Sequence, residues 1–257
     1  MKEENAKIKQ ISGGVCAAEG FLAAGVYCGI RRNRTKKDLA LIFSEKPADA
    51  AAVYTRNLVK GAPLAVTKRH VDSGRISAVI CNSGIPAESV AVASTGVIGQ
   101  PLDIEPIKRG IPELKKSLSR DASPAAQAIM TTDTVEKQVA VEFELGGKTV
   151  RLGGIAKGSG MIHPNMATML VFLTTDAAVS GTMLQKALSG DIENTFNMMS
   201  VDGDTSTNDM VLLLANGMAG NEEITCDNDD FRTFMCALNT VNVALCKMLA
   251  GDGEGAT

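Results

Sequence analysis

The chain has 257 residues, of which 45% are hydrophobic, so it can form one large domain or two small ones with a sizeable core. A net charge of -3, two Tyr and no Trp argue against a nucleic-acid partner, because neither a basic stripe nor a set of stacking aromatics is present. Six cysteines form no CxxC pair and only two histidines occur, so we expect no metal site and reduced, buried thiols.

Targeting and membrane segments are not expected. The N-terminal residues mix charges of both signs and lead into no apolar segment, which argues against a secretory signal. The apolar stretch at residues 15–30 contains Glu19 and several glycines and is too short to cross a bilayer. We therefore expect a cytoplasmic protein that does not enter a membrane.

The first half of the chain is expected to be mainly strands. Short apolar runs that end in polar or glycine residues predict buried strands at residues 39–43, 51–54, 76–81 and 89–93. Residues 113–118 are expected to form a short helix. Ser123 before Pro124 is typical of a helix start, with Ser123 as the N-cap and the helix running to about residue 130.

Strands and helices mix in the second half. Alternating apolar residues at 139–145, the Gly146-Gly147 turn and residues 149–152 predict a hairpin. Further expected elements are strands at 169–173 and 211–215, an amphipathic helix at 180–199, and a long helix from Asp229 to about residue 249. The predicted class is α/β or mixed α+β, with mixed sheets covered by helices.

A glycine-rich segment surrounds Lys157. Gly153, Gly154, Gly158 and Gly160 could form a loop whose backbone N–H groups and lysine bind an anion, or a plain turn after the hairpin. The spacing differs from that of a nucleotide-binding P-loop. Both interpretations remain open from composition.

Thr168 is a candidate nucleophile. A threonine hydroxyl needs an adjacent base, and a threonine at a chain terminus supplies its own, because its free α-amine has a pKa of about 7.7–8.0. The small residue Ala167 before it would permit the hydroxyl to attack the preceding carbonyl and cleave the chain. From the residues alone an ordinary strand residue is the better interpretation of Thr168, as spacing does not single it out.

Four other polar features have two interpretations each. Ser94, Thr95 and Gly96 could donate to an oxyanion or form a tight turn. His163 could be a general base or a loop residue that caps backbone groups. Residues 202–209 have the composition of a metal loop without EF-hand spacing, and a polar loop is the better interpretation. Residues 251–255 are a flexible end or a loop that presents Glu254 to a cationic ligand.

Four motifs in order carry a specific resemblance. The segments at 94–99, 157–170, 201–209 and 252–257 resemble the signatures of the ornithine acetyltransferase / glutamate N-acetyltransferase family, and the likeness extends from about Gly13 to the end. The resemblance implies an acyltransferase of arginine biosynthesis with an α/β sandwich fold like that of self-processing aminopeptidases. It implies cleavage between Ala167 and Thr168, giving an α chain of residues 1–167 and a β chain of residues 168–257.

The resemblance also implies the site and the reaction. Thr168 would take an acetyl group from N-acetylornithine and pass it to glutamate, with acetyl-CoA as a further possible donor. Thr95 and Gly96 match the oxyanion hole, and Thr134, Lys157, Thr168 and Glu254 match substrate-binding positions. No metal or prosthetic group is implied, and the two kinds of chain are expected to pair into a heterotetramer.

The chain departs from the family pattern in two places. It stops at Thr257, just after the last motif, where family members continue, so the β chain is expected to be truncated. Gly84 is followed at once by Ile85, where family members carry a longer stretch. Two alternatives therefore stay open: an N-terminal-nucleophile amidohydrolase or aminopeptidase, and an inactive truncated family member.

Overall fold

Nine strands form one continuous mixed sheet in the part of the chain that the structure describes. This computed structural model describes residues 7–81, 90–94, 103–160, 169–204 and 206–255. The strands are β1 (Lys9–Ile11), β2 (Phe21–Val26), β3 (Leu39–Tyr54), β4 (Arg75–Cys81), β5 (Val90–Ala93), β6 (Lys137–Leu145), β7 (Lys148–Lys157), β8 (Leu170–Thr175) and β9 (Met210–Ala215).

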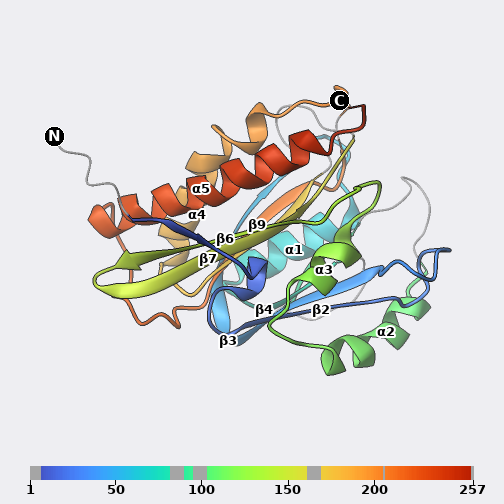
Figure 1. The fold of residues 1–257 in the computed structure, drawn as a ribbon, viewed down its shortest axis with the longest axis horizontal. Coiled ribbons are helices and arrows are strands. Elements are labelled where there is room, and N and C mark those ends of the chain that lie inside the picture. The colour runs from blue at the N-terminus through green and yellow to red at the C-terminus, as the bar shows by residue number, and fades with distance from the viewer. Residues whose placement is uncertain (1–6, 82–89, 95–102, 161–168, 205, 256–257) are drawn as a thin grey trace.

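The long strand β3 folds this sheet into two layers. The strand order is β1-β6-β7-β8-β9-β3-β4-β5, with β2 also paired to β3. The register of β3 against β4 shifts between Phe43 and Ala48, and residues 49–54 pair with β9 instead of β2. A shift of this kind bends a strand. Figure 1 shows the result, with β6, β7 and β9 in one layer and β2 and β4 in another.

Helices pack on the outer faces of the layers and also between them. They are α1 (Ala62–Asp72), α2 (Glu105–Lys116), α3 (Ser123–Ile129), α4 (Gly181–Ile192) and α5 (Asp229–Gly251), with short 3-10 helices η1 (Gly14–Cys16) and η2 (Phe196–Met198). In Figure 1, α4 and α5 lie on the outer side of β6 and β7, and α2 lies on the far side of β2. Both α1 and α3 add side chains to the core between the layers. The predicted sandwich of mixed sheet and helices is confirmed.

The alternation of side chains along β8 explains the two main cores. Val171 and Leu173 face the core under α4 and α5, whereas Leu170 and Phe172 face the core between the layers. Because both faces are covered, β8 is an unbroken apolar run rather than an alternating one. The same holds for β9, so these two parallel neighbours form the buried centre of the fold.

Helix α5 begins as the sequence predicts. The Asn228 side chain accepts the Phe231 N–H, and Asp229 and Asp230 lie in the first turn. Among the described residues, α5 is the one helix long and apolar enough to cross a membrane. One of its faces, including Phe234 and Leu245, is buried against the sheet, as in the core helix of a globular domain.

The bounds of three predicted helices differ in the structure. The helix expected at 113–118 is the end of the longer α2, which begins at Glu105. The helix expected at 180–199 ends at Ile192, and η2 follows it. There the Thr195 hydroxyl donates to the Asp191 carbonyl, a local bond that competes with helix continuation. The expected cap Ser123 lies inside α3, and its hydroxyl donates to Glu136 instead.

Candidate active site

Four strand ends meet at one end of the sheet. Lys157 of β7 pairs with Leu170 of β8, which pairs with Met210 of β9, which pairs with Tyr54 of β3. The residues next to these ends, including Met169 and Asp209, therefore lie together although they come from distant parts of the chain. This convergence defines the candidate active site.

The glycines before Lys157 belong to a strand, so the predicted loop or turn is wrong for Gly153 and Gly154. Both lie inside β7. A Cβ atom on Gly153 would lie 1.9 Å from the Gly14 carbonyl oxygen, and one on Gly154 would lie 2.6 Å from Cδ2 of Leu173. These close approaches require glycine, and the positive φ of 153° at Gly158 ends the strand. Lys157 is therefore the last residue of a packed strand.

Lys157 is a buried cation. Lys157 is only 2% exposed, and its Nζ donates to Oγ1 of Thr131 at 3.1 Å. Burial lowers the pKa of Lys157, and the nearby charges of Asp133, Cys81 and Asp209 oppose that shift. No ion pair joins Lys157 to a carboxylate within the described ranges. A buried ammonium group in this state can gain from an anionic ligand group.

Asp209 holds the chain beside the predicted nucleophile. Its Oδ1 accepts the backbone N–H of Met169 at 3.0 Å, and the residue is buried. Burial raises the pKa of Asp209 to about 7, although the Ser206 side chain, the Met169 N–H and Lys157 favour its charged form. Sequence reasoning placed Asp209 only within a polar loop. Its position directly before the apolar strand β9 was the signal that could have found it.

Glu254 lies in an ordered loop beside the Lys157 segment. Its backbone N–H donates to the Ser159 carbonyl at 2.6 Å. A Cβ atom on Gly160 would lie 2.8 Å from Cδ of Glu254, so the carboxyl group rests against that glycine. Residues 251–255 are therefore bonded to the Lys157 segment, and the role of Glu254 toward a cationic ligand stays a prediction.

Thr134, the third predicted substrate-binding residue, is bonded to the same loop. Its backbone N–H donates to Oδ2 of Asp252 at 3.0 Å, and its hydroxyl also donates to the Asp252 carboxylate. Asp252 lies two residues before Glu254. Thr134 and Glu254 thus belong to one connected group, with Thr134 engaged by the protein itself.

The remaining predicted residues lie outside the described residues. These are Thr95 and Gly96 of the oxyanion motif, His163, and the junction of Ala167 and Thr168. Their described neighbours are nevertheless informative. Ala93 at the end of β5 pairs with Cys81, and Cys81 is close enough to Lys157 to raise its pKa electrostatically. The end of β5 that leads toward Thr95 therefore lies at the same end of the fold as Lys157.

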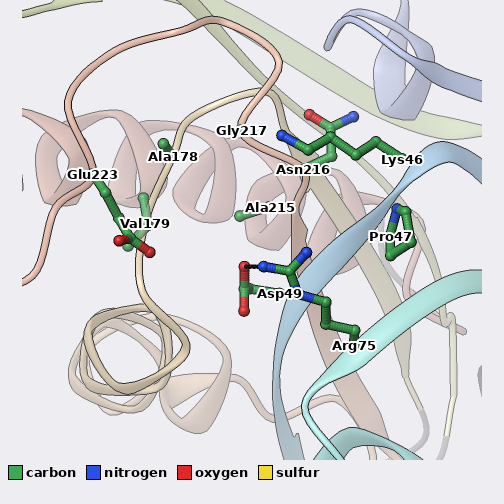
Figure 2. Close-up of a pocket in the computed structure, with 10 residues that line it drawn as sticks. All are labelled: Lys46, Pro47, Asp49, Arg75, Ala178, Val179, Ala215, Asn216, Gly217 and Glu223. Atoms are coloured by element: carbon green, nitrogen blue, oxygen red, sulfur yellow. Dashed lines mark ion pairs between the residues drawn. The ribbon is translucent and has the colours of Figure 1, made fainter.

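A separate pocket lies at the opposite end of the central strands. It has a volume of about 200 Å³ and is lined by Lys46, Asp49, Arg75 and Asn216 among others. Figure 2 shows Arg75 directed toward Asp49, at an ion-pair distance of 3.7 Å. Ala215 in its wall is the other end of β9 from Met210, so this pocket is not part of the candidate site. Within the described ranges, no group of three or more His, Cys, Asp or Glu could hold a metal.

Comparison with known proteins decides the family. The sequence profile of the ArgJ family matches residues 22–87 and 84–257. This chain belongs to the ArgJ family. The two matched stretches overlap at residues 84–87. This is the Gly84–Ile85 junction, where the chain lacks a stretch that the family pattern leads us to expect. The predicted acyltransferase of arginine biosynthesis is confirmed at this level.

Individual ArgJ proteins agree with this membership. The arginine biosynthesis bifunctional protein ArgJ of Symbiobacterium thermophilum is 48% identical over 275 residues, which cover 96% of this chain and 68% of that protein. The solved ArgJ of Bacillus halodurans is 41% identical with a TM-score of 0.59, covering 64% of this chain and 100% of that one. Ornithine acetyltransferase of Mycobacterium tuberculosis, solved with ornithine, is 35% identical with a TM-score of 0.54, covering 61% and 98%.

The fold itself extends beyond ArgJ. An L-aminopeptidase D-Ala-esterase/amidase of Ochrobactrum anthropi, described as a variant of the Ntn hydrolase fold, has a TM-score of 0.54. It is 12% identical and covers 95% of this chain and 86% of its own. This likeness concerns the fold alone and agrees with the expected sandwich.

Proposed function

We propose that this ArgJ chain transfers an acetyl group from N-acetylornithine to glutamate through an acetyl ester on Thr168. The proposal rests on the position of Lys157, the Glu254 loop and Met169, which follows Thr168 in the chain, at the same end of the sheet. A buried ammonium and a carboxylate suit a substrate that has both a carboxylate and an ammonium group. N-acetylornithine has these two groups.

The proposed chemistry begins with cleavage of the chain. The Thr168 hydroxyl attacks the Ala167 carbonyl, the peptide C–N bond breaks, and water opens the resulting ester. Cleavage frees the α-amine of Thr168, which is the base that its hydroxyl needs.

Acetyl transfer then proceeds in two matched halves. The Thr168 hydroxyl attacks the acetyl carbonyl of N-acetylornithine, its proton passes through the α-amine to the leaving nitrogen, and ornithine departs. The amine of glutamate next attacks the acetyl ester and regenerates the hydroxyl. Thr95 and Gly96 are proposed to donate to the oxyanion in both halves. All these groups come from the chain, so the reaction as proposed uses no metal or prosthetic group.

Three further assignments follow the family. Acetyl-CoA is proposed as a second acetyl donor, in keeping with the bifunctional proteins that this chain matches. The α and β chains are proposed to stay together and to pair into a heterotetramer. The proposed location is the cytoplasm, where an enzyme that acts on free amino acids meets its substrates.

A hydrolase is the second candidate, because the fold is also that of an aminopeptidase and amidase. In that case water rather than glutamate would take the acyl group from Thr168. The two candidates differ in their acceptor. N-acetylglutamate should form only when glutamate is added, whereas a hydrolase would release acetate equally fast without it.

The test is a search for the acetyl ester. Purified protein is incubated with N-acetylornithine labelled in the acetyl group, and its peptides are analysed by mass spectrometry. We expect the label on the peptide that begins at Thr168 and its transfer to glutamate on addition. Thr168→Ala should lose the label, while Thr182→Ala, an exposed threonine of α4, should keep it. A label absent from the wild-type protein would contradict the proposal.

A further inference from the structure

A buried group of three charges connects the segments that carry Lys157 and Glu254. Lys137 is completely buried, and its Nζ donates to Oδ1 of Asp133 at 2.7 Å and to Oδ2 of Asp252 at 2.5 Å. Both carboxylates are nearly inaccessible as well, with side chains 0% and 6% exposed. Asp133 lies just before β6 and Lys137 is its first residue, whereas Asp252 follows the last residue of α5. The three charges therefore join two distant parts of the chain.

Asp133 fixes the surroundings of Lys157. Its Oδ1 accepts the N–H of Gly158 at 2.7 Å, and its Oδ2 accepts the N–H of Thr131 at 2.9 Å. Gly158 is the residue after Lys157, and Thr131 supplies the hydroxyl to which Lys157 donates. One carboxylate thus holds the backbone next to Lys157 and the side-chain partner of Lys157.

Asp252 fixes the surroundings of Glu254 in the same way. It is bonded to Thr134 and Lys137, and two residues later the Glu254 N–H donates to the Ser159 carbonyl. This last bond joins the Glu254 loop to the Lys157 segment, because Ser159 is the second residue after Lys157. Thr132 adds a further link, with its hydroxyl 2.6 Å from that of Ser159.

The charges in this group are retained in the folded protein. Burial works against ionisation of Asp133 and Asp252, but hydrogen bonds from Lys137 and from backbone N–H groups outweigh it. The pKa of each carboxyl group is therefore below its ordinary value. Because ion pairs buried in this way tolerate little movement, they can keep two loops at a fixed separation.

We propose that Asp252 is a positioning residue that sets the separation of Lys157 and Glu254, and thereby the length of amino-acid substrate that the site accepts. This inference rests on the proposed function, in which those two side chains hold the substrate. N-acetylornithine and Nα-acetyllysine have the same charged groups and differ by one methylene in the separation between them. A site with a fixed separation should prefer the shorter one, and one methylene is typically worth about 10- to 200-fold in kcat/KM.

The experiment compares the two substrates with wild-type protein, Asp252→Asn and Asp252→Glu. The asparagine variant loses a charge beside Lys137, and the glutamate variant keeps the charge on a longer arm. We expect the preference for N-acetylornithine to fall about tenfold in Asp252→Asn through KM, with kcat changed less than about threefold. Asp252→Glu should show a smaller shift and a melting temperature near that of the wild type. Asp227→Asn, at an exposed ion-paired aspartate before the other end of α5, should leave the preference unchanged.

The outcomes distinguish failure of the positioning role of Asp252 from failure of the proposed function. Wild-type turnover with an unaltered preference in Asp252→Glu, or a loss confined to kcat in both variants, overturns the positioning role and leaves the proposed function standing. Should Asp252→Asn fail to fold, Asp252→Glu decides by the same ratio. Wild-type protein that neither turns over N-acetylornithine nor binds ornithine in a calorimetric titration overturns both.

Discussion

Met169 donates its backbone N–H to Oδ1 of Asp209 at a distance of 3.0 Å. This bond joins the start of β8 to the residue before β9, and it holds the peptide unit that Met169 shares with Thr168. Asp209 is thus both a structural acceptor and a buried titratable group.

Asp209 should make stability depend on pH. Its pKa of about 7 in the folded protein exceeds the ordinary value of 3.8, so the folded state binds the proton more tightly than the unfolded state. Stability from this group is complete below about pH 4 and is lost as the pH rises to about 7. Asp209→Asn keeps an acceptor for Met169 and removes the titration. Relative to this variant, the wild type should lose roughly 1–4 kcal/mol between pH 4 and 7.

The measurement is urea unfolding of both proteins across this pH range. The difference between them isolates Asp209, because Lys157 and all other groups are shared. Parallel stability curves for the two proteins would show that Asp209 titrates as in the unfolded chain.

Lys157→Met should weaken substrate binding without weakening the fold. The methionine removes the ammonium proposed to hold a carboxylate, and a charged hydrogen bond of this kind is worth about 1.5–3 kcal/mol, or about 10- to 100-fold in KM. The melting temperature should stay the same or rise, because a buried charge without a bonded carboxylate is costly to the fold. Lys148→Met, at the exposed start of the same strand, is the control. An unchanged KM in Lys157→Met would remove Lys157 from the substrate site.

Gly153→Ala should destabilise the protein. The new methyl group would lie 1.9 Å from the Gly14 carbonyl oxygen, which is backbone and cannot rotate away. Overpacking of this kind costs about 1–3 kcal/mol or more. Gly190→Ala in the exposed interior of α4 meets nothing within 4 Å and should instead stabilise by about 0.5–1 kcal/mol. Thermal melts that rank the two variants in the opposite order would contradict the packing of η1 on β7.

Thr67→Val should loosen the strand that leads toward the oxyanion motif. The buried Thr67 hydroxyl donates to the Val92 carbonyl at 2.6 Å and accepts the Val92 N–H at 2.7 Å, so it takes the place of a neighbouring strand at the free edge of β5. Valine keeps the shape but leaves both groups unpaired, at a cost of about 1–3 kcal/mol. Hydrogen exchange at the Val92 amide should become faster, while Thr182→Val should not affect it. Unchanged exchange in Thr67→Val would show that Val92 has other partners.

Most of the core elements could be predicted from the sequence. The unbroken apolar runs of β8 and β9, the alternation in β6, and the acids at the start of α5 all reflect local physics that the fold keeps. Strands expected at 39–43 and 51–54 proved to be parts of the one strand β3. The residues between them include Glu45, Lys46 and Pro47, which give no local strand signal. Their strand conformation comes from the bend of β3 between the two layers and not from a hydrophobic pattern.

Other elements had weak signals. β1 has three residues, β2 is rich in alanine and glycine, and α1 carries only Leu64, Thr67 and His70 as buried residues. Their pairing and burial come from tertiary contacts that no short window of sequence contains. The glycines of β7 were interpreted as a loop or turn for a related reason. Glycine is needed within this strand because the Gly14 backbone and Leu173 approach it closely, and neither contact is visible in the local sequence.

The candidate site was predicted by resemblance more than by pattern. Lys157 and Glu254 could be named from motifs, but their mutual placement depends on the bonds of Lys137 to Asp133 and to Asp252, which comes from a distant part of the chain. Likewise, the sequence did not distinguish Asp209 from the other residues of its polar loop. Charge networks of this kind are visible only when the strand ends are assembled.

Self-cleavage at Thr168 is tested most directly by N-terminal sequencing of the purified protein, together with its intact mass. We predict two chains, one of which begins Thr-Met-Leu-Val-Phe, and a single uncleaved chain for Thr168→Ala. A wild-type protein that turns over N-acetylornithine while remaining one intact chain would contradict it, because Thr168 would then have no free amine to serve as its base.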